Sequence, residues 1–250
     1  MDSPSDPPPD QKNGRVVGRV VALWRYPVKS MGAEGLDETE VGWHGLAGDR
    51  RWAFVRDGIP QSGFPWLTIR QRANMGHYRP RFLDPADPDG SPTSVQTPDG
   101  RAFDVTDPAL AAELAPGARV IRQSRGVFDT FPLSLLSTGS VAGLGALMGL
   151  PPGAALDPQR FRPNLLVEGT DGAPFAEDAW VGAVLSIGGA QMRVDKRDGR
   201  CAVVNVDPAT SHADPAVLRT IAREREGCMG IYGTTVQPGR VAVGDAVVLV

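Results

Sequence analysis

The stretch AVLSIGGAQMRV, residues 183–194, places Gly188-Gly189 between two short runs rich in apolar residues. Two consecutive glycines accept the positive φ angles of a tight hairpin turn, so this stretch predicts two antiparallel strands joined at the glycines. The last residues, RVAVGDAVVLV (240–250), predict a second hairpin around Gly244-Asp245. Many short strands separated by glycine turns, with few helices between them, predict a mainly β, barrel-like fold.

The other segments fit this class. Residues 15–24 and 51–55 are rich in β-branched and aromatic residues and are expected to be strands. Residues 107–115 and 214–226 each begin with Asp-Pro, a pair that favours a helix start. Residues 132–150 predict a strand, a small-residue turn and a helix from about Ser140. Residues 84–100 predict an exposed loop or a hairpin connection. There is no βαβ alternation, which argues against a doubly wound nucleotide-binding fold.

Composition narrows the function classes. The chain has 250 residues and a net charge of −3, so nucleic acid is not an expected partner. No apolar run reaches the roughly 18 residues of a membrane span. The acidic, proline-rich residues 1–14 predict a disordered tail rather than a secretory signal, and a cytoplasmic location is expected. Arginine outnumbers lysine 23 to 3, and the arginine fork suits carboxylate and phosphate ligands.

One of the two cysteines has a cationic neighbour. In RDGRCAVVNVDP, residues 197–208, Cys201 directly follows Arg200 and precedes an apolar run that is expected to be a strand. Nearby positive charge favours the thiolate, which is a good ligand for soft metals. A buried core cysteine is an equally good interpretation of the spacing alone. Cys228 lies among small and apolar residues and is expected to serve packing.

Several basic and polar residues suit an anionic ligand. Lys29 and Ser30 follow the proline bend of RYPVKSM, although a solvated loop lysine is the simpler interpretation. Arg50 and Arg51 should alternate in a strand, so that only one of them faces a ligand. In RFRPNLL, Arg162 and Asn164 offer donors and an acceptor. The three histidines lack the close spacing of zinc sites, and no G-x-S-x-G elbow of a serine hydrolase occurs.

The order of these motifs carries a family resemblance. The segments WRYPVKSM, GDRRWAFV, TIRQ, FPLSLLSTGSV, RFRPNLLVEG, FAEDAWVG, GRCAVVNVDP and VAVGD occur as they do in proteins with a MOSC domain, named after the C-terminal part of molybdenum cofactor sulfurase. From Val16 to Val250 the chain resembles the subgroup that includes the amidoxime-reducing component. The resemblance implies a smaller β-barrel module over residues 15–110 and a β-barrel-like MOSC domain over residues 111–250.

The resemblance also implies a cofactor site. In this family a molybdenum ion is held by a pterin-dithiolene cofactor, and a protein cysteine supplies a further sulfur ligand. Cys201 matches that cysteine and is the expected catalytic residue and metal ligand. Gly199 stands where relatives carry a side chain, so any contact there is expected from the backbone. By motif match, the cofactor is expected to be bound by Lys29, Ser30, Arg50, Ser137, Thr138, Gly139, Arg162, Asn164, Arg200 and Tyr232.

Relatives reduce N-hydroxylated compounds by two electrons, so the resemblance implies a molybdenum-dependent reductase of small N-oxygenated substrates. The sequence shows no iron–sulfur cysteine cluster and no dinucleotide fingerprint. A separate electron-transfer protein is therefore expected, of the flavoprotein, ferredoxin or cytochrome b5-like kind. No pyridoxal phosphate is expected, because the desulfurase domain of the full sulfurase is missing. Two alternatives stay open: a sulfur carrier that uses a Cys201 persulfide, and a carrier of the molybdenum cofactor.

Overall fold

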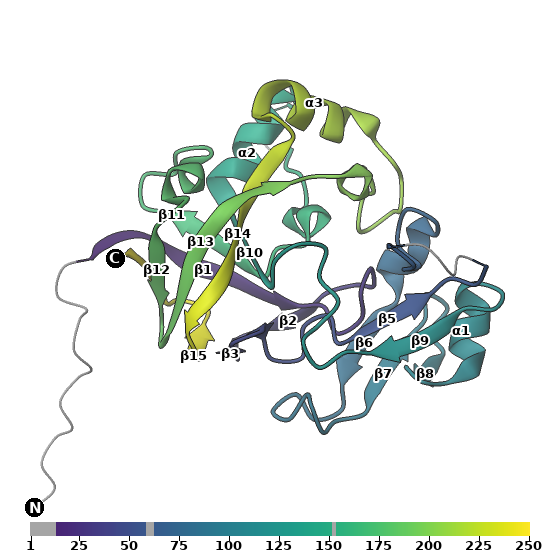
Figure 1. Ribbon diagram of the computed structural model, residues 1–250. Helices are drawn as coiled ribbons and strands as arrows, with labels where there is room; N and C mark the ends of the chain where they lie inside the picture. Colours follow the sequence, from purple (N-terminus) through teal and green to yellow (C-terminus); the bar gives the residue numbers. More distant parts are fainter. Residues whose placement is uncertain (1–13, 59–62, 152–153) are drawn as a thin grey trace, which may run out of the picture.

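The computed structural model describes residues 14–58, 63–151 and 154–250, so the predicted disordered tail lies almost wholly outside the described residues. The fold is mainly β with a few helices, as the sequence predicts (Figure 1). The large sheet lies to the left in Figure 1, with β3 and β15 at its foot, and strands β5 to β9 lie at the lower right.

The large sheet closes into a seven-stranded barrel. Its strands pair in the order β11-β10-β14-β13-β12-β16-β1, and a further pairing between β1 and β11 completes the ring. The short strand β2 pairs with β1 outside this ring. The bounds of these strands are Arg15–Arg25 (β1), Glu34–Leu36 (β2), Leu133–Ser137 (β10), Leu165–Gly169 (β11), Val184–Ile187 (β12), Ala190–Gly199 (β13), Cys228–Gln237 (β14) and Ala246–Leu249 (β16).

The barrel core explains why these segments are strands. Inward positions are aliphatic and fully buried, and they come from strands on all sides of the ring. Alternation of apolar and polar residues directs one set of side chains inward and the other outward. The fully buried members include Val20, Leu135, Val167, Val194, Ile231 and Val247.

One predicted hairpin is confirmed and the other is wrong. β12 and β13 pair antiparallel around Gly188-Gly189, and Gly188 has a φ of 55°. The turn at Gly244 instead joins two sheets. β15 (Gly239–Ala242) pairs with β3 (Glu38–Gly42), whereas β16 pairs with β12 and β1. Two consecutive strands form a hairpin only when they pair with each other. Here each of the two strands pairs with other strands instead.

The smaller sheets surround a second core. β5 (Trp52–Val55) pairs with β9 (Arg119–Arg122), and β6 (Arg79–Phe82), β7 (Thr93–Gln96) and β8 (Ala102–Asp104) form a three-stranded sheet. The third small sheet, β15-β3-β4 with β4 at Gly45–Leu46, instead packs on the barrel core, through Val41, Leu46 and Val241. The prediction of an exposed loop or hairpin connection over residues 84–100 is confirmed, because residues 83–92 join the antiparallel strands β6 and β7. The segment also contributes β7 itself, where Thr93 and Val95 are buried. β1 and β2 precede residue 110 but pair within the large sheet. The division of the chain at residue 110 stays a prediction.

The helices begin at capping side chains. Asp107 accepts a hydrogen bond from the N–H of Ala109 at α1 (Pro108–Leu114), and Asp214 does the same for Ala216 at α3 (Pro215–Arg225). Both predicted helices are thereby confirmed. The turn expected before Ser140 is wrong, because α2 (Thr138–Leu147) begins directly after β10. The four 3₁₀ helices in the described ranges are η1 (Ala73–His77), η2 (Pro158–Phe161), η3 (Ala176–Trp180) and η4 (Ala202–Asn205).

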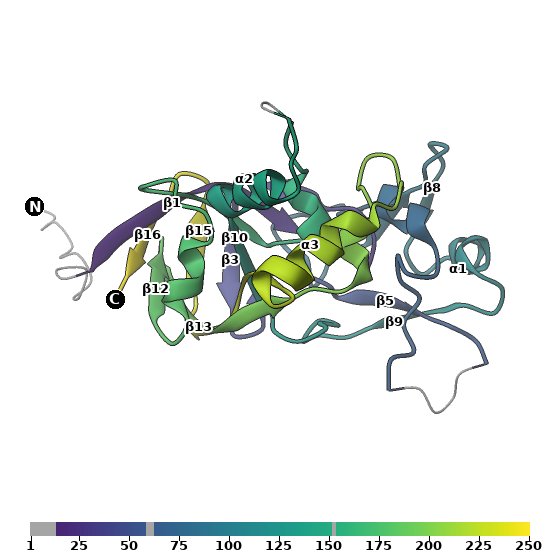
Figure 2. The same cartoon turned by 90° about the horizontal axis from the view of Figure 1, so that it is seen from above.

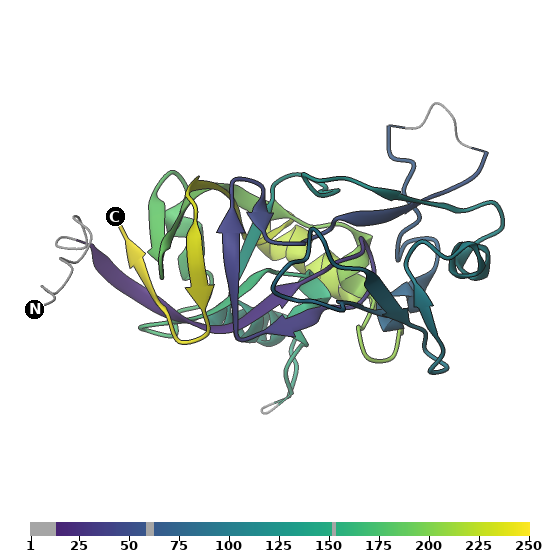
Figure 3. The same ribbon diagram turned by 90° about the horizontal axis from the view of Figure 1, so that it is seen from below.

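Figure 2 shows α2 and α3 on the same side of the barrel, where a third cluster of buried apolar residues joins them. Figure 3 shows the start of β1, in purple, beside β16, in yellow, at the end of the molecule opposite the sheets formed by β5 to β9. None of the helices in the described ranges has the length and apolar character that a membrane span needs.

Gly230 allows β14 to pass close to β10. Its φ is 75°, and a Cβ at this position would lie 2.7 Å from the carbonyl oxygen of Leu135. We expect Gly230→Ala to lower the free energy of unfolding by about 1–3 kcal/mol, because a left-handed backbone and a steric clash are combined. Equilibrium unfolding in urea measures this loss, provided that the slope of the unfolding free energy against urea concentration is the same in both proteins. The control is Gly35→Ala, where no atom lies within 4 Å; equal losses in both variants would contradict the explanation.

Candidate functional site

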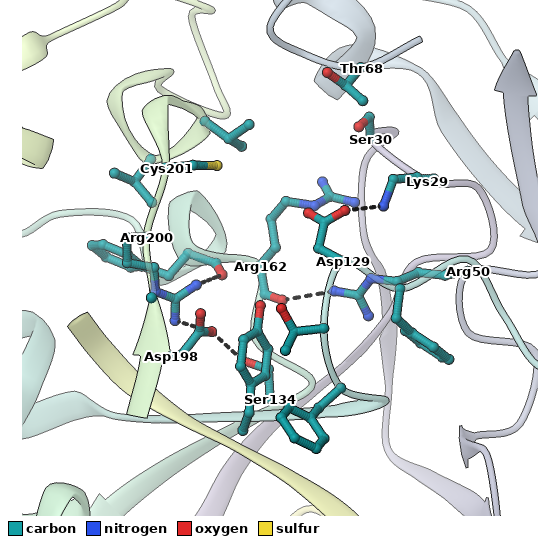
Figure 4. Close-up of a pocket in the computed structure, with 18 of the residues that line it drawn as sticks. Lys29, Ser30, Arg50, Thr68, Asp129, Ser134, Arg162, Asp198, Arg200 and Cys201 are labelled. Carbon is teal, nitrogen blue, oxygen red and sulfur yellow. Dashed lines mark hydrogen bonds and ion pairs between the residues drawn. The ribbon is translucent and has the colours of Figure 1, made fainter. Parts of the chain in front are cut away.

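A cavity of about 320 Å³ lies where the barrel meets the smaller sheets. Figure 4 shows side chains from both parts of the chain projecting into it. Its volume is at the lower end of those that hold small ligands and cofactors. Eight of the predicted site residues line this pocket: Lys29, Ser30, Arg50, Arg162, Asn164, Arg200, Cys201 and Tyr232.

The predicted segment Ser137-Thr138-Gly139 is not among the lining residues. The Ser137 hydroxyl donates to Glu177 Oε2 at 2.8 Å and accepts from the N–H of Ser140, so it caps α2. A Cβ on Gly139 would meet the carbonyl oxygen of Ala173 at 2.7 Å. The segment fixes the start of α2, and its role in cofactor binding stays a prediction.

Cys201 lies directly after a strand rather than at the start of one. β13 ends at Gly199, and the N–H of Arg200 bonds to the carbonyl of Gly227 at 2.8 Å. The apolar residues that follow, Ala202–Asn205, form the 3₁₀ helix η4, which corrects the predicted strand. Cys201 precedes this helix with an extended backbone, and Figure 4 shows its sulfur directed toward the pocket.

The cation that contacts the thiol is not its sequence neighbour. Arg200 donates to the carbonyls of Met229 and Phe161, each at 2.7 Å. Its remaining nitrogen lies 2.7 Å from Asp198 Oδ2. Arg70 instead makes the side-chain hydrogen bond with Cys201, and this bond raises the pKa of the Arg70 guanidinium. Arg70 belongs to the TIRQ motif, but nothing in the sequence connects it with residue 201.

Arg197 is likewise engaged elsewhere. Its guanidinium bonds to Glu226 Oε2 at 2.7 Å and to the carbonyl of Arg225 at 2.8 Å. It also lies 3.1 Å from Asp178 Oδ2. Carboxylates and carbonyls therefore occupy the guanidinium groups of both arginines that lie near Cys201 in the sequence, Arg197 and Arg200.

The pocket concentrates strained backbone. Ser30, Arg50 and Arg162 have φ angles of 66°, 50° and 53°, and they are three of the six non-glycine residues with positive φ in the described ranges. Such conformations cost roughly 1–3 kcal/mol each and persist where surrounding contacts impose them. Their concentration at one cavity marks it as a functional site.

Arg50 and Arg51 diverge as predicted, but for another reason. β5 begins only at Trp52, so Arg50 is not part of a strand. Its left-handed backbone places the side chain in the pocket, where Nη2 donates to the carbonyl of Arg162 at 3.1 Å (Figure 4). Arg51 lies outside the pocket lining and is 3.3 Å from Asp89.

Arg162 and Lys29 face the centre of the pocket with different partners. Arg162 Nη1 donates to the carbonyl of Met31 at 2.8 Å, whereas Nη2 is buried without a hydrogen-bond partner. Burial lowers the pKa of Arg162 to about 10, so it stays charged at neutral pH. Burial also lowers the pKa of Lys29. Its Nζ contacts the half-exposed carboxylate of Asp129 at 2.5 Å, at the rim of the pocket.

Asn164 lines the pocket, but its side-chain amide is hydrogen-bonded to other groups of the protein. Oδ1 accepts from the N–H of Ser134, and Nδ2 donates to the carbonyl of Trp24 and to Asp49 Oδ2. Asp49 is buried, and it also accepts from the N–H of Tyr26 at 2.8 Å and from Arg50. Asn164 therefore positions its neighbours rather than presenting free donors. Asp49 lies outside the pocket lining and supports Arg50 and Asn164 from behind it, and no sequence motif marks this role.

A second missed carboxylate forms part of the pocket wall. Asp198 Oδ2 accepts from the Ser134 hydroxyl at 3.2 Å, and the Tyr232 hydroxyl bonds to the same carboxylate. Burial raises the pKa of Asp198 to about 6, against the opposing charge of Arg200. Burial also raises the pKa of Tyr232, which stays neutral.

The charge of the lining is strongly positive. Six basic side chains line the cavity with two carboxylates, Asp129 and Asp198. The basic residues are Lys29, Arg50, Arg70, Arg160, Arg162 and Arg200. Clustered guanidinium groups with low-dielectric walls favour a ligand that carries phosphate or another anionic group.

The chain is similar to proteins of known name. The mitochondrial amidoxime-reducing component 1 of Homo sapiens is 27% identical over 300 residues, which cover 93% of this chain and 83% of that protein. The molybdenum cofactor sulfurase of Danio rerio is 38% identical over 76 residues, or 30% of this chain, and that of Caenorhabditis elegans is 27% identical over 240 residues, or 85% of this chain. These matches span only 9% and 33% of the two sulfurases.

A solved structure supports the fold. The YuaD protein from Bacillus subtilis superposes with a TM-score of 0.50 at 13% identity, and the match covers 95% of this chain and 98% of that one. The MOSC N-terminal beta barrel domain model matches residues 17–115, and the MOSC domain model matches residues 122–248. The chain thus belongs to the MOSC family and carries the N-terminal β-barrel domain ahead of its MOSC domain.

Proposed function

We propose that this protein binds the molybdenum cofactor in the pocket beside Cys201 and reduces N-hydroxylated compounds by two electrons. The observation that carries the proposal is the free Cys201 thiol, directed toward a cavity lined by six basic residues. The resemblance over most of the chain to a protein named for amidoxime reduction supports this reaction class. The proposal includes a cytoplasmic location, where unpaired cysteines stay reduced.

The residues present fit this cofactor. A thiolate is a suitable molybdenum ligand, and Cys201 has no disulfide partner. The buried Arg162 Nη2 lacks a hydrogen-bond partner, which an anionic ligand would supply. In this assignment Cys201 holds the metal, and the phosphate of the cofactor is bound by Lys29, Ser30, Arg50 and Arg162. When bound, the cofactor supplies a metal centre that accepts and returns two electrons.

The chain itself binds and orients the substrate. Gly199 lies beside Cys201 in the pocket lining, and a Cβ there would meet no atom within 4 Å. This space leaves room for a substrate near the thiol. Phe131 at the rim packs against Tyr232 with ring centroids 6.0 Å apart, so a planar apolar group has an aromatic surface to contact.

A second candidate function is sulfur transfer through a Cys201 persulfide. The specific observation is that the side chain of Cys201 is partly exposed and bonded to Arg70, which is itself exposed at the rim. A cation beside a solvent-accessible thiol also suits a sulfur nucleophile. The partial match to two molybdenum cofactor sulfurases favours this alternative over a plain cofactor carrier.

The test is to produce the protein in a host that makes the cofactor and to measure bound molybdenum, pterin and benzamidoxime reduction. We expect stoichiometric molybdenum and turnover with a chemical reductant. With NADH alone we expect no turnover until a flavoprotein, ferredoxin or cytochrome b5-like partner is added. Molybdenum-free protein with transferable sulfane sulfur on Cys201 would favour the sulfur carrier. Protein that contains the cofactor but does not reduce benzamidoxime with any electron donor would favour the role of cofactor carrier.

A further inference from the structure

Asp198 has one carboxylate oxygen in use and one unused. The side chain is 1% exposed and belongs to the pocket lining. Oδ2 lies 2.7 Å from Arg200 Nη2 and 3.2 Å from the Ser134 hydroxyl, as Figure 4 shows. Oδ1 is buried without a hydrogen-bond partner. A buried acceptor left unpaired on a cavity wall is costly unless a proton or a ligand satisfies it.

The groups around Asp198 suit a carboxyl that exchanges a proton. Arg200 faces it from the end of β13, Tyr232 from β14, Ser134 from β10 and Arg50 from the segment before β5. Burial raises the pKa of Asp198 to about 6 despite these groups. General acids work best with a pKa near the working pH. The Tyr232 hydroxyl bonds to Asp198 and also lines the pocket, so it links the buried carboxyl to a bound substrate.

We propose that Tyr232 and Asp198 form a proton relay in which the Tyr232 hydroxyl donates to the departing oxygen and Asp198 returns a proton to Tyr232. This inference rests on the proposed reductase function. Conversion of N–OH to N–H consumes two electrons and two protons, breaks the N–O bond, forms an N–H bond and releases water. The external donor supplies the electrons, the relay supplies one proton and solvent water supplies the other. The Asp198 carboxylate that remains is paired with Arg200 until water protonates it again.

The first test compares Asp198→Asn with wild type, using chemically reduced, molybdenum-loaded protein and benzamidoxime. Asparagine keeps the shape of the side chain but cannot donate the acidic proton. We expect kcat to fall roughly 100-fold, with KM within about twofold. Wild-type kcat should decline as pH rises above about 6, whereas the kcat of the variant should be independent of pH there. Tyr232→Phe should lower kcat similarly. Because Tyr232 is also an expected cofactor contact, kcat is expressed per bound molybdenum for each variant.

The matched control is Asp195→Asn on the same strand. Asp195 accepts from Thr234 at 2.8 Å and pairs with Arg193, and it lies outside the pocket lining. Its variant should keep both kcat and the pH profile of wild type. A thermal melt of each variant verifies folding, and Tyr232→Phe keeps the proposal testable if Asp198→Asn fails to fold.

The second readout does not depend on turnover. Infrared difference spectra of the protein between about pH 5 and pH 8 should contain a protonated carboxyl band that is lost in Asp198→Asn and kept in Asp195→Asn. Wild-type kcat and pH dependence in both Asp198→Asn and Tyr232→Phe would overturn the relay and leave the reductase intact. Absence of the band in wild type would also overturn the relay. A loaded wild-type protein without turnover would overturn the reductase, and the relay with it.

Discussion

Replacing Cys201 with alanine is expected to abolish benzamidoxime reduction and to change the absorption spectrum of the bound molybdenum. The reason is that this thiol is the proposed metal ligand, and the end of β13 directs it into the pocket. Cys201→Ser is the conservative variant, and it should lose activity as well, because a hydroxyl is not a soft ligand. Activity with a chemical reductant and metal content by mass spectrometry are the measurements.

Cys228 provides the matched control for this experiment. It is the other cysteine, it stands opposite Gly199 across the β13–β14 pair, and it lies outside the pocket lining. Its sulfur lies 3.8 Å from the carbonyl oxygen of Glu226. Cys228→Ala should therefore keep both the spectrum and most of the activity. If the two alanine variants behave alike, Cys201 is not the ligand.

Removing Lys29 and Arg162 together is expected to strip the protein of its cofactor. Each provides a charged hydrogen bond worth about 1.5–3 kcal/mol, so each single alanine variant should weaken cofactor retention by roughly 10- to 100-fold. The double variant should lose more than either single one. Pterin and molybdenum content after extended dialysis measures retention, and the thermal midpoint without cofactor measures the effect on the fold.

Arg51→Ala is the internal control for the cationic pocket. It removes the same charge from a neighbouring position, but Arg51 pairs with Asp89 outside the pocket. Its cofactor content should match that of wild type. Unchanged pterin occupancy in Lys29→Ala and Arg162→Ala, or an equal loss in Arg51→Ala, would refute specific binding at these two residues.

Local sequence rules predicted local structure well. The Gly188-Gly189 hairpin and the two helices that open with Asp-Pro depend on contacts within a few residues, and the structure has all three. The hairpin predicted at Gly244 failed because pairing partners are decided by the whole chain. Tertiary contacts determine which strands pair with each other, and a local sequence pattern does not predict those contacts.

The residues of the site were predicted only in part, because their contacts also depend on tertiary structure. Motif order identified Cys201, Lys29 and Arg162, but adjacency in sequence suggested the wrong cation for the thiol. Arg200 is paired with Asp198, whereas Arg70, which is far from Cys201 in the sequence, bonds to the thiol. Asp49 and Asp198 escaped attention because their importance comes from burial, which a single sequence does not display.

The closure of the barrel by β1 has a consequence for synthesis on the ribosome. Gly18 pairs with Gly169, and Arg15 pairs with Leu249. At roughly 5–20 residues per second, on the order of 10 s passes before translation reaches even the nearer partner. Until then the short strand β2 is the one large-sheet partner of β1 already made, and it pairs only with Leu23–Arg25, so the rest of β1 is an open edge that is prone to aggregation. A fragment ending near residue 110 keeps that edge permanently, and the complementary fragment has an open seam between β11 and β16, so neither half is expected to be expressed well alone.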